Sequence, residues 1–208
     1  RKTARFGRRR KIVLKLRIAC LFAALTFVFG ATAGRSDVNV CLAELCVSDK
    51  RVTETTVVAK LGDGVRVHHP DDVGLSRCYF DAASGVWADF TFAGKEESSA
   101  NGELRGIMLS EQKMCEGRRG TRKASLGRRL AGASIGMSES EVLASRGQPT
   151  RVDDARGREA RKPLMSDTRY SANFGDSVYV YEKPDDLGFT FIYFKDGRVR
   201  TIWFSESE

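Results

Sequence analysis

The chain has few of the residues, and none of the short motifs, that enzymes commonly use for catalysis. Its only two histidines, His68 and His69, are adjacent, and it lacks a Gly-x-Ser-x-Gly nucleophile elbow and a phosphate-binding glycine loop. Two adjacent histidines seldom supply two ligands to one metal ion, and no third ligand accompanies them. We therefore expect no enzyme, no metal and no cofactor, and keep a small hydrolase or metal-binding protein using His68 and His69 as an alternative.

The chain also lacks an apolar run of the roughly 20 residues that span a bilayer as a helix. Its apolar stretch at residues 18–30 is shorter, follows a start rich in Lys and Arg, and precedes Ala31-Thr32-Ala33. This order is typical of a secretory signal peptide with small residues at the cleavage site. It predicts a signal over residues 1–33, cleavage after Ala33 and a periplasmic or secreted protein. A retained membrane anchor is the alternative.

Acidic residues are absent from the first 33 positions, and their absence changes how the net charge is interpreted. The formal net charge is +8, with 35 Lys and Arg against 27 Asp and Glu, and nine of the basic residues lie in this segment. The remaining chain is therefore nearly neutral. Nonspecific nucleic-acid binding needs a basic footprint on the folded domain, so nucleic acid is excluded as a partner.

Cysteines are absent after residue 115, and four of them follow the predicted signal: Cys41, Cys46, Cys78 and Cys115. An even number of cysteines in an exported chain predicts two disulfides, for which three pairings are possible. A zinc site fits less well, because the first two cysteines are loosely spaced and no second close pair follows.

Two segments of the first half recur in the second half, in the same order. Residues 51–67 align with residues 136–152, and residues 104–111 align with residues 199–206. Such self-similarity indicates a duplicated unit. We predict an α+β fold made of two tandem helix-plus-antiparallel-three-strand units after an N-terminal signal helix. The units span residues 41–116, with the disulfides, and residues 130–208, and residues 117–129 form a basic, glycine-rich linker.

Local signals place the elements of each unit. Thr53 and Ser138 are predicted helix caps, Ser138 with Glu141 as a capping box, and Gly62 and Gly147 are predicted helix ends. Alternating apolar residues predict the strands at 77–81, 85–93, 103–110, 177–182, 188–195 and 198–205. Asp196-Gly197 predicts a tight hairpin turn between the last two strands.

One stretch resembles a known family. Gly136-Met-Ser-x-x-Glu-Val-Leu-x-x-x-Gly-x-Pro149, followed by strands around Phe-x-Asp-Gly-Arg-Val199, resembles the helix-plus-meander unit of the SmpA/OmlA outer-membrane-assembly lipoproteins. The tandem arrangement is similar to the β-lactamase-inhibitory-protein fold. The resemblance implies a non-catalytic envelope protein that binds other proteins with its sheet. The chain departs from that family at Arg146, where an apolar residue is usual, and has no lipobox cysteine.

The alternation of side chains along strands predicts which residues a partner could contact. Phe90 and Phe92, with the aligned Phe191 and Tyr193, are expected to pack on the helices. Trp and Met are enriched at interface centres, so the other face is the predicted protein-binding face, with internal packing as the alternative. Its predicted residues are Trp87, Met108, Ile192, Phe194 and Trp203.

The linker is a weaker candidate contact, for an anionic envelope surface, because arginine recognises phosphate well. Its basic residues are Arg118, Arg119, Arg122, Lys123, Arg128 and Arg129. Together these patterns predict an exported, non-catalytic protein-binding module, inhibitor-like or an envelope assembly factor, whose partner is another envelope or secreted protein. The alternative is an envelope-associated structural protein held at the membrane by an uncleaved signal or by the linker.

Overall fold

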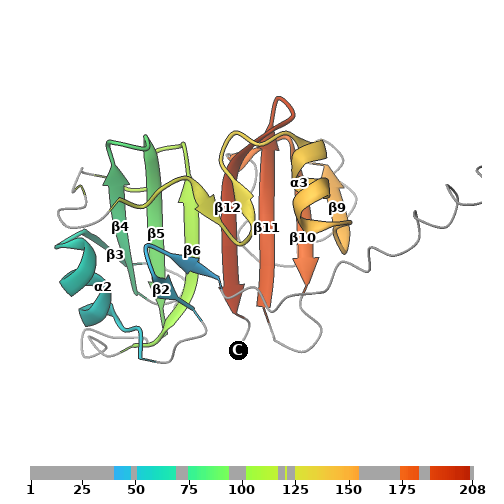
Figure 1. Ribbon diagram of the computed structural model, residues 1–208. Helices are drawn as coiled ribbons and strands as arrows, with labels where there is room; N and C mark the ends of the chain where they lie inside the picture. Colours follow the sequence, from blue (N-terminus) through green and yellow to red (C-terminus); the bar gives the residue numbers. More distant parts are fainter. Residues whose placement is uncertain are drawn as a thin grey trace, which may run out of the picture. The chain divides into compact units, whose positions relative to one another are not determined.

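The structure is a computed structural model that describes residues 40–47, 51–68, 75–93, 102–116, 120, 125–154, 174–182 and 188–206. The predicted signal peptide, its cleavage site and His69 lie outside these residues. The described chain is dominated by one antiparallel sheet of eight strands, seen face-on in Figure 1. Neither helix of the described residues is long and apolar enough to cross a membrane.

The strands follow the order β3-β4-β5-β6-β12-β11-β10-β9 across the sheet, and all neighbouring pairs are antiparallel. Their bounds are β3 Val65–His68, β4 Leu75–Asp81, β5 Val86–Phe92, β6 Leu104–Ser110, β9 Arg151–Asp154, β10 Ser177–Glu182, β11 Gly188–Lys195 and β12 Arg198–Glu206. The two halves of the chain therefore meet where β6 pairs with β12, with Met108 opposite Trp203.

The predicted α+β class is wrong, because the described residues are mostly β. The helices whose bounds the structure gives are α2, Glu54–Leu61, and α3, Glu139–Arg146, of eight residues each. The main sheet has eight strands, where six were predicted. The strand count was too low because β3 and β9 have four residues each, too few for a clear alternation. The β6–β12 pairing joins residues far apart in sequence, which local periodicity does not report.

The local predictions agree with the structure more closely than the predicted fold class does, because they depend only on neighbouring residues. Strands β10 and β11 have the predicted bounds, and β12 ends one residue later than predicted. The Ser138 hydroxyl accepts from the Glu141 N–H, and the Glu141 carboxylate accepts from the Ser138 N–H, so the predicted capping box is confirmed. Asp196 and Gly197 have φ of 52° and 71°, as a two-residue hairpin turn requires.

The main hydrophobic core lies between the sheet and a layer that covers one face of it. Figure 1 shows α2 and α3 in front of the two halves of the sheet. Two short hairpins complete this layer: β1 Cys41–Leu42 with β2 Leu45–Cys46, and β7 Arg129–Leu130 with β8 Ala133–Ser134. Leu42 and Leu130 from the hairpins pack in one cluster with Ile107 and Ile202 of the central strands. The hairpins thus cover apolar residues that the short helices do not reach.

Each helix is held to its half of the sheet by two polar contacts in matching places. The Tyr79 hydroxyl donates to the Gly62 carbonyl at 3.0 Å, and the Tyr181 hydroxyl donates to the Gly147 carbonyl at 3.2 Å. At the other end of α2, Arg77 Nε lies 2.6 Å from a Glu54 carboxylate oxygen. At the same end of α3, the Tyr179 hydroxyl donates to Glu139 at 3.1 Å. The duplication inferred from the sequence remains a prediction, but these positions are directly comparable.

Candidate protein-binding face

The face of the sheet away from α2 and α3, called the back face below, is defined by the strand register. Residues paired across neighbouring strands point to the same side of a sheet. Met108 pairs with Trp203, and Trp203 pairs with Phe191. None of these three side chains belongs to the cluster that contains the helix residues. They belong to a separate cluster on the back face.

This second cluster, called the aromatic patch, lies mainly on the back face of β10, β11 and β12 and extends to Met108 on β6. Its members are Met108, Phe174, Val178, Val180, Phe189, Phe191, Tyr193 and Trp203. Phe191 stacks on three neighbours: the ring centroids are 5.2 Å from Trp203, 6.1 Å from Phe189 and 6.5 Å from Tyr193. Aromatic rings at these separations attract one another beyond the burial of their surface, so the row is held in a fixed arrangement.

Burial divides the patch into a supporting part and an accessible part. Phe174, Val178, Val180 and Tyr193 are buried, whereas four large apolar side chains are only partly buried. These four are Met108, Phe189, Phe191 and Trp203. A monomer gains most by burying such side chains completely, so their partial exposure on a well-packed support marks a surface that could take a partner.

Polar groups border the patch on two sides. On the β9 edge, Arg151 is paired with Asp153 at 2.8 Å, and these residues lie opposite Val180 and Val178. On the β5 side, Asp89 lies opposite Met108. Protein interfaces commonly have this composition, with apolar and aromatic residues at the centre and polar residues around the rim.

The other half of the back face contains a disulfide, and four apolar side chains packed around it are also partly buried: Val65, Val67, Phe80 and Met114. Cys78 on β4 is bonded to Cys115, which follows β6 in sequence. Cys78, Cys115 and Trp87 are buried together. Phe80 packs on Trp87 with ring centroids 5.0 Å apart. Trp87 therefore belongs to a small cluster separate from both the main core and the aromatic patch, and it has little exposed surface for a partner.

The structure places some of the predicted residues on the back face and others on the helix side. Met108 and Trp203 lie on the back face and are partly exposed, as predicted. Trp87 lies on that face but is only 4% exposed. The placement of Ile192 and Phe194 on the open face is wrong, because they are 0% and 1% exposed and pack on the helix side.

The error has one physical cause. The sequence alignment paired Phe191 with Phe90, whereas the strand register places Phe191 opposite Trp203 and Asp89 opposite Met108. Phe191 therefore corresponds to Asp89, one position away, and a one-residue shift moves every side chain of a strand to the other face. Phe189, Phe191 and Tyr193 were missed for this reason, although their strict alternation is visible in the sequence.

The disulfide pairing is Cys41–Cys46 and Cys78–Cys115, one of the three that the sequence allows. The first bond closes the β1–β2 hairpin, in which Cys41 pairs with Cys46. The second anchors the segment after β6. Disulfides form and persist mainly outside the reducing cytoplasm, so both bonds fit an exported protein.

The end of the predicted linker is bound to the sheet rather than free. The buried Asp81 carboxylate accepts from the Ser84 and Ser125 hydroxyls and from the Ala83 and Leu126 N–H groups. Burial alone would raise the pKa of Asp81, but these hydrogen bonds outweigh it and hold the pKa below its usual value of 3.8. Residues 125 and 126 are thereby fixed against the turn between β4 and β5.

This anchoring limits the predicted contact with an anionic surface. Arg128 donates to the Ser84 carbonyl and is paired with Glu111, so its charge is already engaged. Arg129 is exposed on β7. The other four basic residues of that prediction lie outside the described residues: Arg118, Arg119, Arg122 and Lys123.

The histidine alternative finds no support in the part of the chain that the structure describes. His68 is the last residue of β3. Among the described residues, no group of His, Cys, Asp and Glu is placed to hold a metal ion.

Comparison with known proteins assigns no family to the chain. No protein-family model and no curated protein matches it. A DUF4309 family protein, YjgB, from Bacillus subtilis subsp. subtilis str. 168 aligns at 13% identity and a TM-score of 0.43, over 78% of this chain and 82% of that one. An extracellular protein containing a SCP domain from Bacillus anthracis str. Ames aligns at 10% identity and a TM-score of 0.43, over 74% of this chain and 43% of that one. The chain thus spans less than half of the second protein.

Proposed function

We propose that the protein is an exported, non-catalytic binding module whose partner is another envelope or secreted protein. The aromatic patch is the observation that supports this function. Its four partly exposed side chains are the types that carry much of the energy of protein interfaces, and they are packed against buried residues of the sheet. Tryptophan and phenylalanine lose little rotamer entropy on binding, because each has only two side-chain torsions.

The export part of the proposal combines the disulfides with the signal pattern of residues 1–33. Cleavage after Ala33 would release the chain into the periplasm or the medium. The resemblance of residues 136–149 to the SmpA/OmlA proteins favours an assembly factor or an inhibitor-like role over an enzyme. Retention by an uncleaved signal would favour the alternative of a membrane-held structural protein, and fractionation with N-terminal sequencing separates the two.

The binding face can be tested with a double variant, Phe191→Ala with Trp203→Ala. The unmodified chain is used to recover a partner from an envelope extract, and the affinity for that purified partner is then measured by calorimetry. Truncating two central aromatic anchors should weaken binding by about 30-fold or more, the effect of losing a strong interface residue.

Val152→Ala is the matched control, because Val152 is 57% exposed on β9 and lies outside the aromatic patch. It should bind as the unmodified chain does. Equal affinity of the double variant and the control, with both folded by circular dichroism, would refute the proposed face.

A further inference from the structure

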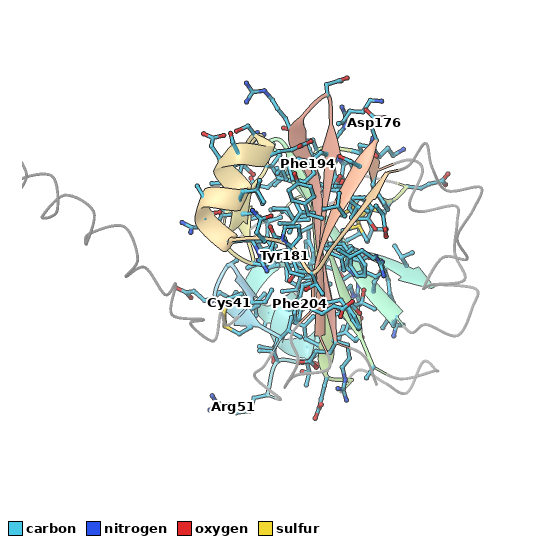
Figure 2. The ribbon with its side chains drawn as sticks, turned by 90° about the vertical axis from the view of Figure 1, so that its right-hand side faces the viewer. Cys41, Arg51, Asp176, Tyr181, Phe194 and Phe204 are labelled. Carbon is cyan, nitrogen blue, oxygen red and sulfur yellow. A yellow bond between two sulfur atoms is a disulfide. The ribbon has the colours of Figure 1, made fainter. Side chains whose placement is uncertain are left out.

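A second site lies on the other side of the sheet, at the C-terminal end of α3. Arg146 is the last residue of this helix, and its guanidinium carbon lies 4.3 Å from the centre of the Tyr181 ring. The stem of the side chain passes Gly132, where an added Cβ would be 3.6 Å from Arg146 Cγ. The guanidinium is thus held between Tyr181 and the turn of the β7–β8 hairpin. Figure 2 labels Tyr181 on the side of the sheet that carries α3.

This cation has no acidic partner among the residues that the structure describes. Arg146 Nε is buried and donates no hydrogen bond there. Burial lowers the pKa of the Arg146 guanidinium, and Tyr181 only partly opposes this effect. The Tyr181 ring and the carbonyl end of α3 stabilise a cation. Neither of them accepts two parallel hydrogen bonds from the guanidinium, as a carboxylate would.

The first half of the chain shows what the fold requires at this position. Leu61 is the last residue of α2, as Arg146 is of α3, and each precedes the glycine whose carbonyl accepts from a tyrosine. Leu61 is 0% exposed in the core. An apolar side chain therefore satisfies the fold here, and a guanidinium in its place is partly desolvated without the ion pair that would compensate.

We infer that Arg146, positioned by Tyr181, binds a carboxylate group of a ligand. The planar guanidinium presents paired N–H donors that match the two oxygens of a carboxylate, and stacking on Tyr181 fixes the plane of that fork. One cation balances one negative charge, which favours a carboxylate over a phosphate dianion. The site lies on the helix-covered side, away from the aromatic patch, so the inference does not depend on the proposed function.

The test is a titration of the isotope-labelled full chain with sodium acetate, followed by nuclear magnetic resonance. The Arg146 Nε–H signal and the Gly147 backbone N–H signal should shift and saturate. Sodium chloride at equal ionic strength should leave both signals unchanged, and sodium phosphate should bind more weakly than acetate. Equal shifts with chloride, or tighter binding of phosphate, would overturn the assignment.

Two variants of Arg146 and one control variant separate binding from folding. Arg146→Leu copies Leu61 and should fold with an equal or higher Tm, while the acetate-dependent shift of Gly147 is lost. Arg146→Lys keeps the charge without the fork and should weaken acetate binding by about tenfold, the cost of losing one charge-assisted hydrogen bond. Arg198→Gln removes an exposed charge elsewhere and should bind acetate normally. An unchanged Gly147 titration in Arg146→Leu would refute the site, and the unmodified chain tests it even if a variant fails to fold.

Discussion

The two halves of the back face belong to one sheet but use their apolar residues differently. In the β3–β5 half, Trp87 is buried beside the Cys78–Cys115 disulfide. In the β10–β12 half, Trp203 is partly exposed at the edge of a stacked row of aromatic rings. One half contains a covalent bond, whereas noncovalent stacking orders the other. Under the proposed function, the first half would serve mainly stability and the second half contact with a partner.

The largest expected difference lies between the two tryptophans. Trp87→Ala should lower the free energy of unfolding by about 3–5 kcal/mol, because it leaves a cavity in a closed cluster. Trp203→Ala should cost roughly 1–2 kcal/mol, since part of that side chain is already in water. Urea unfolding followed by circular dichroism measures both values. Equal losses would mean that the aromatic patch is a core like the other half.

The next largest effect concerns the disulfides. On the chain-entropy model, removing Cys78–Cys115, with a separation of 37 residues, should cost about 4 kcal/mol, against about 2 kcal/mol for Cys41–Cys46, with a separation of 5. Paired Cys→Ala variants in urea test the order. The Cys78→Ala/Cys115→Ala variant should also shift Trp87 fluorescence to the red. A larger loss of stability on removing Cys41–Cys46 would contradict the expectation that the disulfide closing the longer loop stabilises the fold more.

A further predicted effect concerns the polar anchor at Asp81. Asp81→Asn should lower the free energy of unfolding by about 1–3 kcal/mol at neutral pH. The amide has one acceptor oxygen where the carboxylate has two, so some of the buried hydroxyl and N–H donors around it lose their acceptor. The folded-state pKa is depressed, so the charged carboxylate stabilises the fold fully above the usual value of 3.8. That contribution is lost as the pH falls through the folded-state pKa. Urea midpoints measured from pH 6 downward should fall in the unmodified chain and change less in Asp81→Asn.

The parts of this structure that could be predicted from sequence depend on neighbouring residues. Ser138 with Glu141, and Asp196 with Gly197, specify a helix start and a turn through contacts a few residues apart. The bounds of β10 and β11 follow from alternation in the same way. Such signals need no knowledge of the rest of the fold.

The parts that failed depend on pairing over long separations. Nothing in the alternation of β6 or β12 states that Met108 will face Trp203. The side of the sheet on which Phe191 lies depends on register, and aligning Phe191 with Phe90 set that register wrongly by one residue. The cysteine spacing likewise allowed three pairings. The sequence shows Arg146 as a departure from the resembled family, but only the structure places it beside Tyr181 and makes Leu61 its counterpart.

The pairing of β6 with β12 also determines how the molecule could be divided. A chain cut between residues 116 and 125 would give two fragments, each ending its sheet in a strand with unsatisfied N–H and carbonyl groups. Alone, such an edge invites aggregation. When the two fragments are mixed, β6 of one can pair with β12 of the other and complete the sheet. Ile107 and Ile202 then lie in one core again. The protein is therefore suited to fragment complementation, in which reassembly of the two fragments reports an interaction between the proteins fused to them.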